Sequence, residues 1–313
     1  MTLTELRYLV NLDKERHFGR AAERSFVSQP TLSVALKKLE DELGQVLFER
    51  IRGEARPTPV GERIIAQARR VLAEAALIED IAKEGQDELS GALRLGAIYT
   101  VGPYLLPYLV PLLKKRAPKM PLVIEENFTV VLMEQLRNNE LDAILVAQPI
   151  DPDGLQTWAL YDEPFVALLP PDHRWASESI VPSKKLAEEQ LLLLGPGHCF
   201  REQVIEACPK CVDPDADGPK PHTGSSLETI RHMVASGLGI TVVPRSSVEN
   251  RPDEPTLLVS RPLSRPEPQR RIILAWRKTF PRTKAIAAVR DAVLASAMKG
   301  VSFVKDAQPE GAR

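Results

Sequence analysis

The three cysteines of the 313-residue chain lie in one short segment, at Cys199, Cys208 and Cys211. The residues before Cys199 have the pattern of a strand end followed by a helix start, with His198 adjacent and Arg201 two residues later. Backbone amides at a helix start, a protonated imidazole and a guanidinium all favour a thiolate over a thiol. Peroxide oxidises a thiolate to sulfenic acid, which a second thiol converts to a disulfide. The segment therefore predicts redox chemistry at Cys199, with two candidates for the second thiol.

Two other interpretations of the cysteines stay open. A lone cysteine is usually a small buried apolar residue. The pair Cys208-Pro-Lys-Cys211 has the spacing of half a zinc site, which His198 or His222 would extend. A structural zinc site usually needs a second such pair, and the chain has no further cysteine. We therefore expect neither a metal nor a cofactor.

A helix suited to the major groove of DNA is predicted over residues 29–39. Its leucines between Leu32 and Leu43 recur at helical spacing and face inward. A shorter helical segment around Ala21 and Ala22 precedes it, which gives a helix-turn-helix. An ordinary amphipathic helix with solvated polar residues remains the alternative. The candidates for DNA contact lie on the outward face and at the N-terminal end: Gln29, Pro30, Thr31, Ser33 and Lys37.

A basic hairpin is predicted after Phe48, where Arg50, Arg52 and Arg56 flank Gly53. It would lie beside the DNA backbone as a wing, with Arg50 and Arg52 near phosphate or the minor groove. Residues 1–58 are therefore predicted to form a winged helix-turn-helix domain.

A long helix follows over residues 59–89, opened by Pro59. Its small and apolar positions alternate steps of four and three, which is the period of a coiled coil. This pattern favours a dimer through this helix, and a helix lying on its own domain is the alternative. The positions are Ile64, Ala68, Val71, Ala75, Ile78 and Ala82.

Beyond the turn at Ser90 and Gly91, predicted strands alternate with helices, which indicates an α/β domain. Strands are expected at 93–98, 122–127, 143–147, 165–169, 191–194, 240–243 and 271–276, and helices at 105–116, 131–138, 199–208 and 284–297. The fold class is α+β multidomain. Residues 90–300 form two α/β lobes, the first at about 92–162 and 267–300 and the second at about 163–266, followed by a tail at 301–313. The pattern alone does not show how often the chain passes between the lobes.

The positive and negative charges of the chain nearly cancel, so the chain as a whole does not attract nucleic acid electrostatically. The chain has 41 Lys and Arg against 42 Asp and Glu, so any DNA-binding surface must be local. Glu5 and Arg7 interrupt any N-terminal signal sequence, and no apolar stretch approaches the ~20 residues of a membrane span. We expect a cytoplasmic protein with no membrane partner.

Five runs of sequence near the N-terminus resemble the winged helix-turn-helix of LysR-type transcription regulators: Phe18-Gly-Arg-Ala-Ala, Val27-Ser-Gln-Pro-Thr-Leu-Ser, Leu39-Glu-Asp-Glu-Leu-Gly, Leu47-Phe-Glu-Arg and Pro57-Thr-Pro-Val-Gly. The resemblance implies a linker helix and a regulatory domain of two lobes similar to periplasmic binding proteins. It also implies a homotetramer that binds promoter DNA and contacts RNA polymerase, and a regulator rather than an enzyme.

The segment Gly197-His-Cys-Phe-Arg, together with Cys208, resembles the peroxide-sensing members of that family. The resemblance implies that Cys199 is the peroxidatic cysteine, that Cys208 resolves its sulfenic acid, and that Cys211 lies outside the motif. It implies hydrogen peroxide as the signal, control of oxidative-stress genes, and a thiol reductant such as glutaredoxin or thioredoxin. The residues expected around the peroxide are Thr100, Thr129, His198, Arg201 and Arg270, with Arg271 as the alternative arginine.

Two other functions compete with peroxide sensing. A LysR-type regulator could respond to a small molecule bound between its lobes and carry inert cysteines. A metabolite sensor has no reason to carry the motif from Gly197 to Cys208, which favours the redox interpretation. A thiol peroxidase is disfavoured because it would not need residues 1–90.

Overall fold

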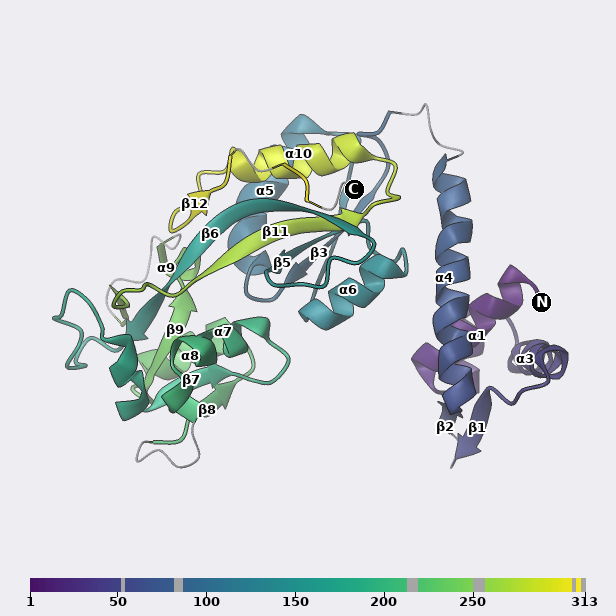
Figure 1. Ribbon diagram of the computed structural model, residues 1–313, viewed down its shortest axis with the longest axis horizontal. Helices are drawn as coiled ribbons and strands as arrows, with labels where there is room; N and C mark the ends of the chain where they lie inside the picture. Colours follow the sequence, from purple (N-terminus) through teal and green to yellow (C-terminus); the bar gives the residue numbers. More distant parts are fainter. Residues whose placement is uncertain (52–53, 82–86, 213–218, 250–256, 306–307, 311–313) are drawn as a thin grey trace. The chain divides into compact units, whose positions relative to one another are not determined.

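The computed structural model describes residues 1–51, 54–81, 87–212, 219–249, 257–305 and 308–310 (Figure 1). The chain forms two compact units, the first made chiefly of residues 1–84 and the second of nearly all the rest. Among the described residues, no helix combines the length and apolar character needed to cross a membrane.

The first unit is a helical domain closed by a two-stranded hairpin. Two of its helices have the predicted boundaries: Thr2 and Ser28 cap α1 and α3 through their side chains, and Gly44 ends α3 at φ +64°. The helix predicted over 59–89 is described as helical only to Ile81, and residues 87–89 lie outside it. The predicted hairpin is confirmed, with Phe48 paired to Pro57. The elements are α1 (Leu3–Glu15), α2 (Phe18–Arg24), α3 (Gln29–Leu43), β1 (Phe48–Ile51), β2 (Glu54–Pro57) and α4 (Pro59–Ile81).

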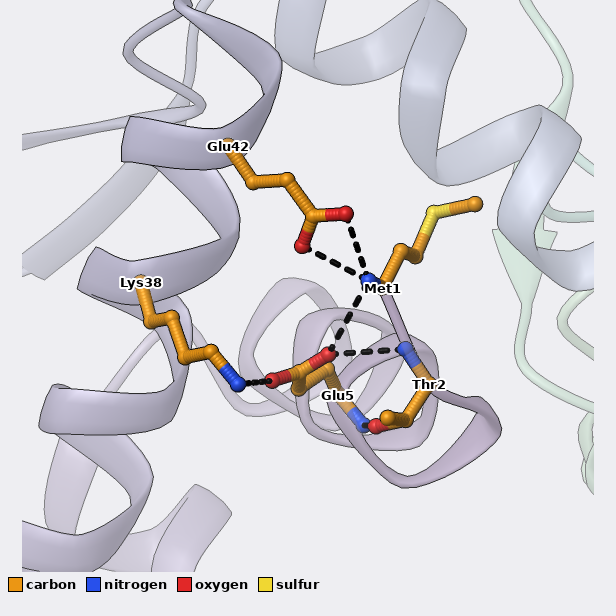
Figure 2. Close-up of polar contacts among 5 residues, drawn as sticks. All are labelled: Met1, Thr2, Glu5, Lys38 and Glu42. Carbon is orange, nitrogen blue, oxygen red and sulfur yellow. Dashed lines mark hydrogen bonds and ion pairs between the residues drawn. The ribbon is translucent and has the colours of Figure 1, made fainter.

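Polar contacts tie the start of α1 to one side of α3, as Figure 2 shows. Thr2 and Glu5 form the predicted capping box, and the carboxylate of Glu5 also lies 3.4 Å from the ammonium of Lys38. The amino group of Met1 lies 2.6 Å from the Glu42 carboxylate. These contacts join the start of α1 to the second half of α3.

The long helix α4 changes character along its length. At its beginning, Ile65 and Ala68 are buried in the core of the first unit. Further along, Val71 is 36% exposed and Ile78 is 69% exposed. The last position of the predicted apolar stripe, Ala82, lies outside the described residues. The helix therefore packs on its own domain at one end and presents apolar side chains to solvent at the other.

The first lobe of the second unit contains a mixed sheet, with parallel strands at one end. The predicted strands at 93–98, 122–127 and 143–147 coincide with β3, β4 and β5, which are parallel neighbours in the order β4-β3-β5. Strand β11 pairs antiparallel with β5, and β6 pairs antiparallel with β11. The elements are β3 (Leu93–Ile98), α5 (Gly102–Arg116), β4 (Leu122–Asn127), α6 (Thr129–Arg137), β5 (Ala143–Ala147), β6 (Leu155–Leu169), β11 (Gln269–Arg277) and α10 (Thr283–Leu294).

The second lobe is built on the far half of β6. Strand β9 pairs antiparallel with this half, and β7 and β8 continue the sheet in parallel. Ser226 caps α8, and Leu227, Ile230 and Val234 are buried on it at helical spacing, a signal that the sequence prediction missed. The elements are η1 (Ser183–Glu188), β7 (Leu191–Leu194), α7 (Cys199–Ala207), η2 (Pro209–Val212), β8 (His222–Gly224), α8 (Leu227–Ala235), β9 (Ile240–Pro244), α9 (Ser246–Glu249) and β10 (Val259–Pro262).

Two apolar cores lie in the second unit, and they divide within β6. Tyr161 belongs to the core of the first lobe and Phe165 to the core of the second. Figure 1 shows β6 and β11 side by side as they run between the lobes, so the chain passes over through β6 and returns through β10 and β11. The segment expected as a tail at 301–313 contains β12 (Ser302–Phe303), which pairs with β6.

Candidate functional site

Cys199 begins helix α7, and β7 ends shortly before it, so the predicted turn from strand to helix at this thiol is confirmed. His198 is the N-cap residue of the helix. Gly197 has φ +94°, and a Cβ at this position would lie 3.2 Å from the ring of Phe128. Glycine is therefore required both by the left-handed backbone and by the close approach of the ring. Cys199 is half-buried and carries a free thiol.

A small pocket opens at the Cys199 end of α7. Two of the predicted residues, Thr100 after β3 and Thr129 at the start of α6, line it together with His198 and Cys199. The Oγ1 atom of Thr129 is buried and has no hydrogen-bond partner within the described part of the chain. The complete lining is Ile98, Tyr99, Thr100, Asn127, Phe128, Thr129, Gly197, His198 and Cys199. The pocket thus combines a thiol, the hydroxyl groups of two threonines and aromatic walls.

The expectation of a protonated His198 is wrong. Its ring makes edge contacts with Phe128, at 4.9 Å between ring centroids, and with Tyr99, at 5.8 Å. Burial lowers the pKa of His198 below its usual 6.5, and a hydrogen bond with the backbone of Ser225 offsets this only in part. The imidazole is therefore neutral at pH 7, because its surroundings are apolar. The neighbours of His198 in the sequence do not show these surroundings.

Arg201 does not line the pocket that it was expected to serve. Its Nη1 donates a hydrogen bond of 2.9 Å to the carbonyl oxygen of Leu194, and its Nε lies 3.8 Å from the Glu202 carboxylate. It is not among the described residues that line the pocket. Its side chain reaches back from the first turn of α7 to the end of β7 and joins the helix to that strand.

Arg270 reaches the pocket indirectly, through Thr100. Its Nη1 and Nη2 donate hydrogen bonds of 2.8 Å to the hydroxyl and the carbonyl oxygen of Thr100. Its Nε donates to the carboxylate of Glu163 at 2.8 Å, and both charged side chains are 0% exposed. The guanidinium also lies 5.0 Å from the centre of the Phe200 ring. The alternative residue, Arg271, pairs instead with Asp162.

Glu163 is a site residue that the sequence interpretation missed. It lies directly across from Arg270 in the antiparallel register of β6 and β11. Its partner depends on a pairing between segments 107 residues apart, which the sequence does not show. The buried pair secures Thr100 at one edge of the pocket.

Cys208 is bonded to Cys211, whereas the sequence resemblance pairs it with Cys199. The Cα atoms of Cys208 and Cys211 lie 5.5 Å apart, and both residues are buried in the core of the second lobe. Cys208 caps the C-terminal end of α7, and the intact helix holds it away from Cys199. No group of three His, Cys, Asp or Glu suited to a metal ion occurs among the described residues.

The outward side of α3 carries the candidate DNA-binding residues. Gln29, Pro30, Thr31 and Lys37 are exposed and Ser33 is half-buried. The ammonium of Lys37 lies 2.9 Å from the carboxylate of Asp41, which raises the pKa of Lys37 and keeps it charged. The hydroxyl of Thr31 is 2.8 Å from that of the cap residue Ser28. Of the wing candidates, the Arg50 side chain and all of Arg52 lie outside the described residues.

Known proteins match both units. Residues 3–62 match the family described as bacterial regulatory helix-turn-helix protein, lysR family, and residues 86–298 match the LysR substrate binding domain. The DNA-binding transcriptional dual regulator OxyR of Escherichia coli K12 is 40% identical over 283 residues, which cover 90% of this chain and 91% of that protein. A hydrogen peroxide-inducible genes activator of Haemophilus influenzae is 38% identical over 94% of this chain and 96% of its own length. A full-length OxyR variant from Pseudomonas aeruginosa aligns with a TM-score of 0.77 at 50% identity, covering 96% of this chain and 98% of that one.

Proposed function

The chain belongs to the LysR family of DNA-binding transcription regulators, and from this we propose that it controls oxidative-stress promoters in response to hydrogen peroxide. Cys199 is the sensing thiol and Cys208 resolves it. The observation that carries the proposal is the free thiol of Cys199 at a helix start, in a small pocket that also holds the hydroxyl groups of Thr100 and Thr129.

The first chemical step is the oxidation of Cys199. Its thiolate attacks one oxygen of hydrogen peroxide, and the second oxygen leaves as hydroxide and takes a proton to become water. The helix N-terminus favours negative charge at this sulfur. The unpartnered hydroxyl of Thr129 is available to bind the peroxide. The buried Arg270, held by Glu163, orients Thr100 on the other side.

The second step couples this chemistry to a change of structure. The thiol of Cys208 attacks the sulfenic acid of Cys199, forming the disulfide and releasing water. An intact helix from Cys199 to Cys208 rises about 13 Å, whereas a disulfide needs Cα atoms within about 7 Å. The helix α7 must therefore unwind, which removes Phe200 from its place beneath Arg270.

The DNA-binding part of the proposal rests on the outward side of α3. Ser33 and Lys37 face the major groove, with Gln29, Pro30 and Thr31 at the N-terminal rim, and the hairpin brings Arg50 and Arg52 to the backbone. The regulator acts in the cytoplasm as a homotetramer that contacts RNA polymerase. A thiol reductant such as glutaredoxin or thioredoxin resets it.

The test is peptide mapping of the thiols of full-length protein before and after brief peroxide treatment, combined with promoter footprinting. We expect oxidation at Cys199 first and a footprint that changes with it. Cys199→Ser should keep one footprint with and without peroxide. Ser177→Ala, at an exposed position of the second lobe, is the control and should respond as the wild type does. A wild-type footprint that changes while Cys199 stays reduced would refute the proposal.

A further inference from the structure

The third cysteine of the segment has no role in the proposed sensing reaction, yet the structure joins it to the resolving cysteine. Cys208 and Cys211 are bonded, with Cα atoms 5.5 Å apart, while α7 stays helical and Cys199 is free. We propose that Cys208 and Cys211 form a second redox site, in which Cys211 exchanges into the Cys199–Cys208 disulfide and returns Cys199 to its thiol. This inference rests on the proposed function, because it starts from the disulfide that sensing forms.

The position of Cys211 makes it a neighbour of Cys208 whether or not α7 is folded. Only two residues separate them, and the backbone N–H of Cys211 donates a hydrogen bond of 3.0 Å to the carbonyl oxygen of Cys208. Cys211 lies in η2, which packs against η1 in the second lobe. Unwinding of α7 therefore moves Cys208 away from its place in the core but cannot move it far from Cys211.

The two possible bonds to Cys208 differ in what they demand of the fold. Cys199 packs against the core of the first lobe, whereas Cys208 and Cys211 belong to the core of the second. A Cys199–Cys208 bond brings together groups held at opposite ends of α7 and in different cores. The Cys208–Cys211 bond leaves α7 intact and keeps Phe200, which is 1% exposed, in place. Refolding of α7 thus favours the exchange.

The exchange balances without a further oxidant or reductant. Hydrogen peroxide takes up two electrons from the protein: one water is released when Cys199 becomes sulfenic acid, and a second is released when Cys208 attacks it and the first disulfide forms. The thiolate of Cys211 then attacks Sγ of Cys208, the Cys208–Cys211 bond forms, and Cys199 leaves as a thiolate. Cys199 takes up the proton that Cys211 lost. The protein stays oxidised by two electrons, but the sensing thiol and the helix that carries it are restored.

The consequence is a signal that ends before any reductase acts. A later reductant is needed to return Cys208, not Cys199, to the thiol state. Until then the protein keeps a free Cys199 without a resolving partner.

The test follows all three cysteines in full-length protein that has been fully reduced and then freed of reductant. Peroxide is added below one equivalent, free thiols are alkylated at successive times, and the linkages are mapped by mass spectrometry. In the wild type we expect the Cys199–Cys208 linkage to rise and then fall, while Cys208–Cys211 rises and Cys199 is again alkylated. In Cys211→Ser the first linkage should last at least about tenfold longer, since the attacking thiol is gone.

Three outcomes separate the possibilities. A Cys199–Cys208 linkage that lasts equally long in the wild type and in Cys211→Ser overturns the exchange but leaves the proposed function standing. Formation of Cys208–Cys211 at the wild-type rate in Cys199→Ser also overturns it, because that bond would then form by direct oxidation. If no Cys199–Cys208 linkage forms in either protein, both the exchange and the assigned resolving role of Cys208 fail. Cys211→Ala repeats the comparison with a side chain that has no hydroxyl. The rise and fall of the Cys199–Cys208 linkage in the wild type tests the exchange even if a variant does not fold.

Discussion

At the residue scale, the hydroxyl of Thr129 is a buried polar group kept without a hydrogen-bond partner in the described structure. Leaving such a group unsatisfied costs about 1–3 kcal/mol, so a ligand that binds it can recover this cost. In the buried pair of Arg270 and Glu163 each charge has a partner, through Oε2 of Glu163, while Oε1 of Glu163 also lacks a hydrogen-bond partner in the described structure. Of the two threonine hydroxyls in the pocket, the one of Thr100 already accepts a hydrogen bond from Arg270 and the one of Thr129 is available.

Replacement of Thr129 by valine should slow oxidation of Cys199 about fivefold, since it removes one hydrogen bond worth about 1 kcal/mol. Valine has the same shape, and it removes an unsatisfied polar atom, so the melting temperature should stay the same or rise. The rate is measured by the loss of the Cys199 thiol after mixing with peroxide, and Thr129→Ser is the control that keeps the hydroxyl. A rate for Thr129→Val equal to that of the wild type would exclude this hydroxyl from peroxide binding.

Replacement of Lys37 by alanine should weaken operator binding and reduce the salt dependence of binding by about one phosphate contact. Lys37 is exposed, and its only described ion pair is with Asp41 on the same helix, so the change costs little stability. Binding is measured by titration at several salt concentrations. The exposed Lys184 on the second lobe provides a charge-matched control, Lys184→Ala. Operator affinity that survives both Lys37→Ala and Ser33→Ala would defeat the proposed docking of α3.

At the scale of elements, the proposed Cys199–Cys208 disulfide requires α7 to unwind, whereas the packing of α7 stabilises the helix. It carries the proposed sensing thiol, Cys199, at its first residue and the proposed resolving thiol, Cys208, at its C-cap. Phe200 and Val204 anchor it in the second core, and Arg270 stacks on Phe200. Formation of the sensing disulfide therefore disturbs a core residue and the buried ion pair next to it, which converts a local bond into a change of packing between strands shared by both lobes.

Hydrogen exchange of backbone amides should detect the unwinding of α7 on oxidation. The amides of residues 199–208 should be protected in the reduced protein and exchange rapidly once the Cys199–Cys208 bond has formed, because α7 must unwind. Cys211→Ser is the suitable protein for the oxidised measurement, and the amides of α8 serve as an internal control that should change little. Equally fast exchange of residues 199–208 in both redox states would mean that α7 is not the switch.

At the scale of the whole molecule, the exposed end of α4 favours assembly. Ile78 is 69% exposed and Val71 is 36% exposed, and both continue the stripe that is buried near Ala68. Apolar side chains at coiled-coil spacing bury this surface when two such helices pair. The proposed tetramer would be assembled from two such dimers, each paired through α4.

Ile78→Glu in the full-length chain should lower the number of subunits, which we expect to be four in the wild type, because it places a charge in the expected helix pair. The position is exposed in a single chain, so folding of the subunit should be unaffected. Sedimentation measures the number of subunits and circular dichroism checks the fold. Ala66→Glu places the same charge at an exposed position outside the stripe and should leave the tetramer intact. A wild-type chain that sediments as a monomer would rule out the assembly.

The sequence by itself determined the features that depend on near neighbours along the chain. Caps at Thr2 and Ser28, the stop at Gly44 and the start of α7 at Cys199 all follow from interactions within a few residues. The strands β3, β4 and β5 follow equally from short apolar runs.

Only the tertiary structure decided the features that depend on distant segments. The register of β6 and β11 brings Glu163 to Arg270, and the aromatic walls around His198 make that imidazole neutral. The residue types alone left Cys208 and Cys211 open as the second thiol and the resemblance favoured Cys208, whereas the fold at the end of α7 bonds these two cysteines to each other. Backbone caps and periodicity are local properties, whereas burial, strand register and pKa are set by residues that are remote in sequence and meet only in the fold.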